Sequence, residues 1–239
     1  MPTPPRATLF ELPLDLVDLN AATALILEWT RDPNARRTVV TLNPEFVVQC
    51  DTDAQFKRDI RAADLVTADG VGITWAAKRF GIDVPGRAPG VDLAKAVMQG
   101  GGKDLRVFFL GAKPGVAERA ALASARDYGI QIAGFQDGYF KPGDEADIAR
   151  RILESDTHLL LTGLGGGKQE RFNERSRAAR VAIGCGGTID VLSGETALAP
   201  AWTRRTGVEW IWRIVTMRRW NRAQRLAQFV VKTLNTKRA

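Results

Sequence analysis

Short apolar segments alternate with longer amphipathic segments along most of the chain, and this alternation restricts the folds that the chain can adopt. The apolar segments predict strands at residues 37–42, 64–68, 106–110, 129–134, 158–162 and 180–184. The amphipathic segments predict helices at residues 53–63, 72–80, 91–98, 116–127 and 144–154. Strands and helices that alternate at this spacing are typical of a parallel sheet with helical crossovers. The sequence therefore predicts an α/β fold, with a Rossmann-like, mostly parallel sheet and helices on both faces.

The alternation stops near residue 200, where the composition also changes. Residues 204–239 carry ten lysine and arginine side chains and one acid, which gives this segment a charge of +9 in a chain whose total is +7. Three tryptophans and a long amphipathic stretch, residues 207–232, lie in the same segment. We predict a Rossmann-like domain over residues 1–200, followed by a basic, tryptophan-rich helical appendage over residues 201–239.

The basic appendage has three interpretations. Its cations would attract anionic lipid head groups, and its indole rings would settle at a membrane interface. The same cations would bind the phosphates of a nucleic acid. The segment would also suit a helix that is solvated, or packed on the domain through its apolar face. Charge alone leaves all three open.

The cysteine count and the absence of a signal segment indicate a cytoplasmic protein. Cys50 and Cys185 cannot build a disulfide framework, so we expect two buried thiols. The chain begins without the charged and apolar regions of a signal peptide, and it has no run of 18 or more apolar residues. If the appendage contacts a membrane, the protein would be peripheral, on the inner face of the plasma membrane.

Polar side chains stand where two of the predicted strands end. Thr41 and Asn43 lie at the end of the first, and Asp69 follows the second, next to a glycine. Ligands of parallel α/β sheets bind at the carboxyl ends of the strands. Asp69 could act there as a general base on a substrate hydroxyl, although Asp-Gly pairs also form ordinary turns.

Two glycine-rich turns follow later strands, at Gly111 and around Gly165. Glycines let backbone amides approach a diphosphate closely, although tight turns need glycine as well. The dinucleotide-binding fingerprint is incomplete, because Lys168 stands at its sixth position, and no P-loop motif is present. The only histidine, His158, opens an apolar strand and suits a structural role. No spacing of metal ligands occurs, so we expect neither a metal nor a cofactor.

Taken in order, several segments resemble the WecG/TagA/CpsF glycosyltransferase family. The resemblance covers about residues 10 to 225. Each matching segment is short, but the set of segments is specific because they follow one another in the family's order. The matching segments are TLNPEFV at 41–47, ADGVGITWAAKRFG at 68–81, FFLGAKPGVAERAA at 108–121, GLGGGKQERF at 163–172, GGTIDVLSGETALAPAW at 186–202 and GVEWIWR at 207–213.

The resemblance implies an inverting, metal-independent transfer of a sugar from a UDP-sugar donor to a sugar carried on polyprenyl diphosphate, in surface polysaccharide synthesis. It implies that Asp69 is the catalytic base and that the appendage closes over the active site and touches an anionic membrane surface. It also allows an oligomer. The substrate-binding residues that it implies are Thr41, Asn43, Arg87, Gly111, Gly165, Gln169 and Arg213.

Three other functions compete with this interpretation. The main alternative is a non-enzymatic nucleic-acid-binding protein that uses the basic tail, but no nucleic-acid-binding motif is present. A nicotinamide-dependent oxidoreductase is disfavoured by the incomplete fingerprint. An inactive relative of the transferases is disfavoured because Asp69 and the expected pocket residues are all retained.

Overall fold

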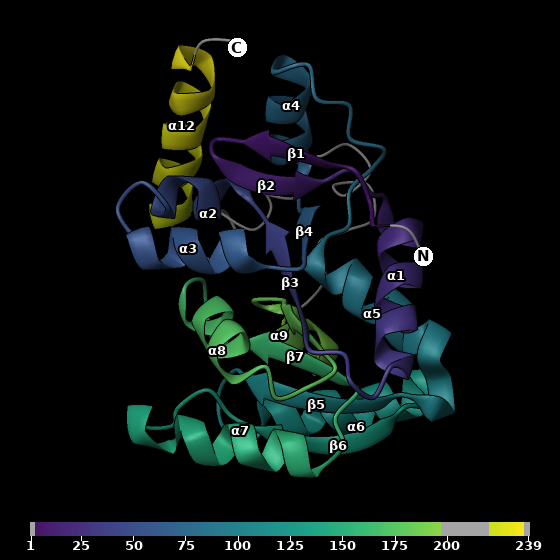
Figure 1. Ribbon diagram of the computed structural model, residues 1–239. Coiled ribbons are helices and arrows are strands. Elements are labelled where there is room, and N and C mark those ends of the chain that lie inside the picture. Colours follow the sequence, from purple (N-terminus) through teal and green to yellow (C-terminus); the bar gives the residue numbers. More distant parts are fainter. Residues whose placement is uncertain (1–2, 197–219, 237–239) are drawn as a thin grey trace.

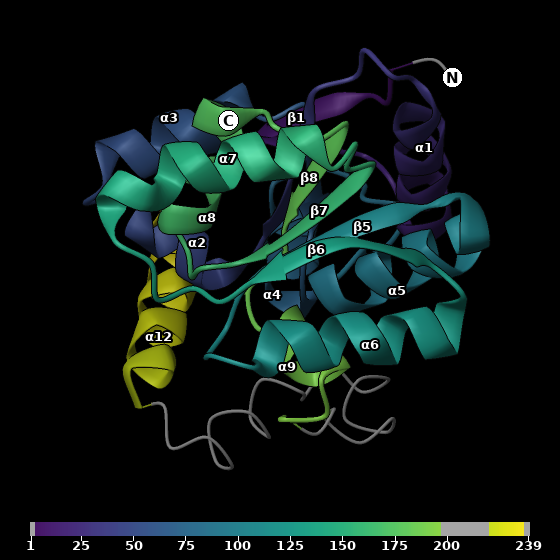
Figure 2. The same ribbon diagram turned by 90° about the horizontal axis from the view of Figure 1, so that it is seen from below.

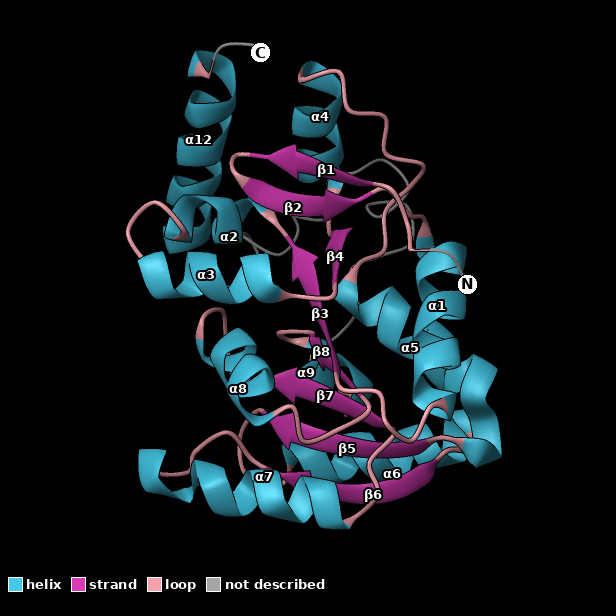
Figure 3. Cartoon of the chain, in the orientation of Figure 1, coloured by secondary structure: helices cyan, strands magenta, loops and turns pink. Residues whose placement is uncertain are grey.

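A six-stranded parallel sheet forms the centre of the molecule (Figures 1 and 3). The computed structural model describes residues 3–196 and 220–236. The strand order is β4-β3-β8-β7-β5-β6, which confirms the predicted Rossmann-like α/β class. The strands are β3 (Arg37–Leu42), β4 (Leu65–Ala68), β5 (Arg106–Gly111), β6 (Gln131–Gln136), β7 (Leu159–Gly163) and β8 (Val181–Gly184).

Helices cover both faces of this sheet, as Figure 2 shows from below. One face is covered by α1 (Leu19–Arg31), α5 (Gly90–Gly101), α6 (Val116–Tyr128) and α9 (Thr188–Leu192). The other is covered by α3 (Ala54–Ala62), α7 (Glu145–Glu154) and α8 (Lys168–Ser176). Most of the strands are buried on both faces, so they read as continuous apolar runs rather than alternating ones, whereas the edge strand β6 is half-exposed. This burial explains why the sequence reveals them.

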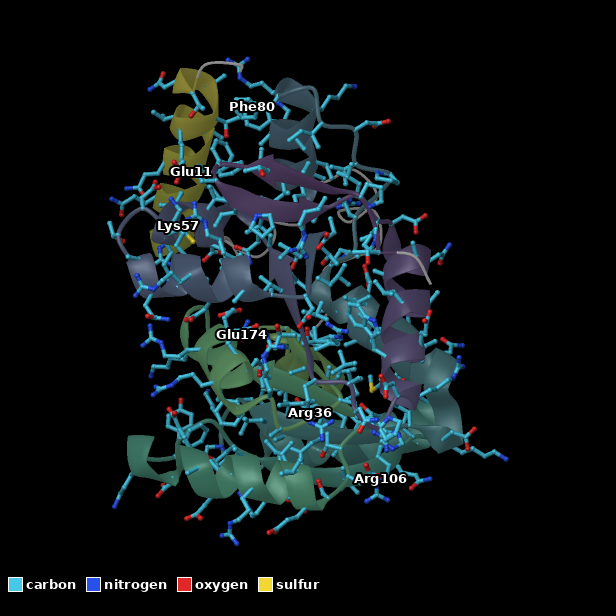
Figure 4. The ribbon with its side chains drawn as sticks, in the orientation of Figure 1. Glu11, Arg36, Lys57, Phe80, Arg106 and Glu174 are labelled. Atoms are coloured by element: carbon cyan, nitrogen blue, oxygen red, sulfur yellow. The ribbon has the colours of Figure 1, made fainter. Side chains whose placement is uncertain are left out.

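A hairpin that the sequence analysis did not predict extends this second face beyond the sheet. It consists of β1 (Arg6–Leu9) and β2 (Leu12–Asp15). The buried Asp15 accepts a hydrogen bond from the backbone nitrogen of Val66 in β4, at 2.6 Å, and pairs with Arg6 at 2.7 Å. Figure 4 labels Glu11 and Lys57, whose ion pair joins the hairpin turn to α3. The hairpin therefore shields the edge strand β4, whose backbone would otherwise be open to pairing.

Two short helices stand at the end of the sheet where β3 and β4 finish. The first, α2 (Pro44–Gln49), begins directly after β3, where the sequence analysis placed only the end of a strand. Asn43 caps it by accepting a hydrogen bond from the backbone nitrogen of Phe46 at 3.1 Å, and Pro44 suits the first helical position. The second, α4 (Val71–Arg79), begins directly after Asp69 and Gly70.

The C-terminal helix α12 (Trp220–Asn235) packs against α2 and the hairpin. Phe229 is 1% exposed and meets Phe10 edge to face, with ring centroids 5.8 Å apart. Arg79 donates hydrogen bonds to the carbonyls of Thr233 and Leu234, at 3.0 and 3.1 Å. Part of the predicted appendage is therefore packed on the body of the protein. The domain boundary near residue 200 falls among residues outside the described ranges and stays a prediction.

Within residues 3–196 and 220–236, no helix combines the length and the apolar character that crossing a bilayer requires.

Replacing Phe229 should release α12 from the body without unfolding the sheet. Phe229→Ala removes a fully buried ring, and such truncations cost about 3–5 kcal/mol. Hydrogen exchange should accelerate in residues 224–235 and stay slow in the sheet. Val230→Ala, on the exposed neighbouring position, is the matched control and should leave exchange unchanged. Slow exchange of α12 in the Phe229 variant would contradict this account of its docking.

Candidate active site

The carboxyl ends of β3 and β4 bring Thr41, Asn43 and Asp69 to one edge of the sheet. Leu42 pairs with Ala68, and the backbone nitrogen of Asp69 donates to the carbonyl of Leu42 at 2.8 Å. Asp69 therefore lies beside the start of α2, with its side chain half-buried. The hydroxyl of Thr41 is buried and donates to the carbonyl of Gly184 at 3.1 Å. This hydrogen bond links the end of β3 to the end of β8.

The loop that carries Arg87 returns to the same edge. The backbone nitrogen of Ala88 donates to the carbonyl of Ala68 at 3.0 Å, and the hydroxyl of Thr67 donates to the carbonyl of Ala88 at 3.1 Å. These two bonds fix the loop against the end of β4, directly before Asp69. Arg87 is half-buried and adjacent to Ala88, so the predicted arginine comes to the neighbourhood of the predicted base.

Three glycines let the turns after β5, β7 and β8 approach one another closely. A Cβ on Gly111, whose φ is +139°, would lie 2.5 Å from the carbonyl oxygen of Gly163. A Cβ on Gly163 would lie 2.6 Å from the carbonyl oxygen of Gly186. Contacts this short exclude any side chain, so the predicted Gly111 serves the packing of the turns. Gly165, by contrast, is exposed, with a φ of +87° and open space around it.

The turns after β5 and β7 also stand at a topological switch point. From β5 the chain continues to β6 on one side, and from β7 it continues to β8 on the other side. The helices that follow these strands, α6 and α8, lie on opposite faces of the sheet. Crevices of this kind are where α/β sheets bind their ligands. Gly111 and Gly163 pair directly across this point.

Asn43 caps α2 at this edge, but three other helices that begin here have no side-chain cap on their first backbone amides. This holds for α4, α5 and α6, which start after Gly70, Pro89 and Gly115. By contrast, α1 and α3 are capped by the aspartates that precede them. Uncapped helix N-termini combine free N–H donors with a positive dipole end, which favours phosphate groups. The edge is therefore suited to a ligand with phosphates.

Gln169 and Glu170 lie beneath this edge, each 1% exposed. One carboxylate oxygen of Glu170 accepts a hydrogen bond from the backbone nitrogen of Gly167, at 2.7 Å. The other accepts from the side-chain nitrogen of Gln169, also at 2.7 Å. The side-chain oxygen of Gln169 then accepts from the backbone nitrogen of Gly186 at 3.3 Å. One buried carboxyl thus connects the turns that follow β7 and β8, and the sequence analysis did not single it out.

Burial raises the pKa of Glu170 from 4.5 to about 7, because the ionised carboxylate loses its hydration. The hydrogen bonds from Gln169 and Gly167 oppose this shift, and the nearby carboxylate of Asp59 adds to it. The native state therefore holds this proton to a higher pH than the unfolded chain does. By linkage, the stability that the protonated group provides is complete below about pH 4.5 and is lost as the pH rises through about 7.

Glu170→Gln should remove this pH dependence. The free energy of unfolding of the wild type, relative to the variant, should fall by about 3 kcal/mol between pH 4.5 and 7.5. Urea unfolding across that range measures the difference. Glu118→Gln, at an exposed position on α6, is the control, and its curve should run parallel to that of the wild type. If the curve of Glu170→Gln also runs parallel to that of the wild type, the pKa of Glu170 is not raised in the native state.

Other residues singled out from the sequence lie elsewhere. His158 is at the opposite, amino-terminal edge of the sheet, where its Nδ1 accepts a hydrogen bond from the backbone nitrogen of Arg106 at 3.4 Å. Cys50 and Cys185 are buried free thiols, and burial raises the pKa of each to about 12. Among the described residues, no three His, Cys, Asp or Glu side chains gather to hold a metal ion. Arg213 lies outside the described residues, and its role stays a prediction.

An edge with glycine-lined turns, uncapped helices and a carboxylate beside them is typical of α/β proteins that bind phosphate-bearing ligands. Within that class, the chain belongs to the WecG/TagA/CpsF family of glycosyl transferases, whose model matches residues 7–239. It is also 33% identical, over 214 residues, to an N-acetylglucosaminyldiphosphoundecaprenol N-acetyl-beta-D-mannosaminyltransferase from Bacillus spizizenii. That match covers 87% of this chain and 82% of the relative. The chain is therefore a glycosyltransferase, which decides against the non-enzymatic alternative.

Proposed function

We propose that the protein transfers one sugar from a UDP-sugar to a sugar carried on a polyprenyl diphosphate, with inversion and without a metal. The placement of Asp69 carries the proposal, because its backbone is bonded to the end of β3 and the Arg87 loop is bonded to the end of β4. A carboxylate and a cation near the carboxyl edge, where parallel α/β sheets bind ligands, support this role in a chain of this family. The name of the relative, which refers to a diphosphoundecaprenol-linked sugar, supports the same acceptor class.

In the proposed mechanism, Asp69 takes the proton of the acceptor hydroxyl. The oxygen attacks the anomeric carbon of the donor sugar, and the bond from that carbon to the UDP oxygen breaks. The electron pair leaves with UDP, so one displacement inverts the anomeric configuration. Arg87, Arg213 and the first amides of the uncapped helices would stabilise the developing phosphate charge.

The predicted binding residues divide into two roles in this proposal. Arg87 and Asn43 would face the substrates, together with Arg213 from the appendage, although the side-chain oxygen of Asn43 also caps α2. Thr41, Gly111 and Gln169 would act by shaping the turns, because their contacts are within the protein. Gly165, on the exposed part of its turn, would contact the nucleotide through its backbone. The basic appendage would hold the protein on an anionic membrane surface, on the cytoplasmic side where UDP-sugars are made available.

Direct assay of transfer tests this function. Purified protein is incubated with N-acetylglucosaminyl diphosphate on a short polyprenyl chain and with UDP-sugars in turn, the N-acetylmannosamine donor first because of the relative. Mass spectrometry should show the addition of one sugar from one donor, and the same yield in EDTA. The absence of transfer from every donor would defeat the proposal. Loss in EDTA that manganese restores would defeat only its metal-free part.

Asp69→Asn should leave the fold intact and lower turnover at least about 100-fold, the scale expected of a general base. Asp127→Asn, on the exposed end of α6, is the matched control and should keep wild-type turnover. Thermal unfolding confirms that both variants fold. Near-normal turnover by pure Asp69→Asn protein would remove Asp69 from this role.

A further inference from the structure

A surface groove runs along α4 on the side that faces away from the core. Ile73, Ala76 and Ala77 point from α4 into the core, whereas Val71 and Trp75 line the groove. Its volume is about 490 Å³, within the range of roughly 300–1,000 Å³ that is typical of ligand pockets. Nothing in the proposed chemistry at Asp69 uses this groove.

The two walls of the groove begin at the proposed reaction centre. The α4 wall starts at Val71, two residues after Asp69. The facing wall contains Ile82 and Val84 and leads, three residues later, to Arg87. From Val71 to Lys78 the α4 wall extends about 10 Å, at the rise of an α-helix. The groove therefore leads away from the substrates rather than forming a separate site.

The lining of the groove suits a hydrocarbon chain. Val71, Trp75, Ile82 and Val84 present apolar surface, and Trp75 is 42% exposed. An exposed indole offers a large apolar face and one polar N–H group. Tryptophan is therefore common at boundaries between apolar and aqueous surroundings. Thr74, Lys78 and Asp83 also line the groove. Lys78 and Asp83 are exposed, so their charged ends can stay in contact with water beside an apolar occupant.

The outer end of the groove lies near further exposed apolar surface. Arg79, next to Lys78, bonds to the last turns of α12, where Val230, Val231 and Leu234 are 43%, 55% and 52% exposed. Figure 1 shows α4 and α12 projecting at the same end of the molecule. Exposed apolar side chains of α12 therefore lie at the same end of the molecule as the outer end of the groove.

We propose that the groove holds the first isoprene units of the acceptor lipid. This inference rests on the proposed function, in which the acceptor sugar lies at Asp69 and its diphosphate lies near Arg87 and the start of α4. The donor is polar throughout, whereas the acceptor ends in a hydrocarbon chain that must leave the site. The groove provides that exit, and the exposed residues of α12 face the membrane into which the chain continues.

Two acceptors that differ only in their chain test the proposal: N-acetylglucosaminyl diphosphate with a farnesyl group and the same compound with an ethyl group. Trp75→Ser and Ile82→Ser should each raise KM for the farnesyl acceptor about tenfold, at unchanged kcat, and leave KM for the ethyl acceptor unchanged. Leu122→Ser, which replaces a 58% exposed leucine on α6, should change neither value. Equal effects on both acceptors, or none, would overturn the inference.

Photolabelling tests the groove without turnover, so it separates this inference from the proposed function. A diazirine-bearing farnesyl diphosphate should label peptides that contain Trp75 or Ile82, and excess farnesyl diphosphate should suppress the label. Labelling elsewhere would overturn the inference even if transfer is observed. A wild type that transfers to neither acceptor, yet is labelled in the groove, would defeat the proposed function and leave the chain site standing.

A photoreactive residue in the groove tests other occupants. Trp75→p-benzoylphenylalanine, irradiated without lipid, should give no intermolecular cross-link and no cross-link to residues outside the groove. A cross-link to residues 197–219 of the same chain would assign the groove to the protein's own tail. A cross-link to a second copy would assign it to an interface. Either result would overturn the lipid assignment.

Discussion

Backbone contacts too close for any side chain hold the carboxyl edge of the sheet in its shape. The ends of β5, β7 and β8 approach one another at Gly111, Gly163 and Gly186, and a Cβ at either of the first two would fall within 2.6 Å of a carbonyl oxygen. Thr41 extends this contact to β3 through the carbonyl of Gly184. The proposed nucleotide turns and the proposed base therefore share one rigid frame, because each strand end is positioned by its neighbour.

The same edge tolerates a buried carboxyl group, which ordinarily destabilises a fold. Glu170 has lost its hydration, but its oxygens accept two hydrogen bonds, from Gly167 and from Gln169. The first bond fixes the backbone nitrogen of Gly167 directly, and the second holds Gln169, which accepts from the backbone nitrogen of Gly186. Flexible glycine turns bring amides close to a ligand, and a buried acceptor beneath them limits the motion that glycine would otherwise allow.

How far the sequence predicts this structure depends on how each element is stabilised. The strands that are buried on both faces were predicted at nearly their observed bounds, because such strands carry a continuous apolar signal. The half-exposed edge strand β6 begins two residues later than predicted. The hairpin was not predicted, because Phe10 and Glu11 occupy its turn at φ values of 53° and 61°, where Asn-Gly is the usual signal. Phe10 is held there by the rings of Phe80 and Phe229, which come from distant parts of the chain.

In the candidate site, too, some residues can be placed from the local sequence and others only from contacts between distant segments. Thr41, Asn43 and Asp69 could be placed from strand ends alone, since parallel strands bring their carboxyl ends to one edge. Arg87 and Gln169 came from the family resemblance, and no local pattern indicates that Gln169 bonds to the turn at Gly186. That contact depends on packing between α8 and β8, which only the folded chain reveals.

The C-terminal helix connects the tail of the chain to the geometry of the site. A Cβ on Gly72, in the first turn of α4, would lie 2.7 Å from Pro44 and 3.5 Å from Phe229. Pro44 opens α2 directly after Asn43, and Gly72 stands three residues after Asp69. Phe229 therefore packs where the helices that follow both residues meet. Because interiors are close-packed, displacement of this ring would let α2 and α4 shift relative to each other, and with them Asn43 and Asp69. The tail thus contributes to the positions of the proposed site residues through packing, in addition to any role of its positive charge.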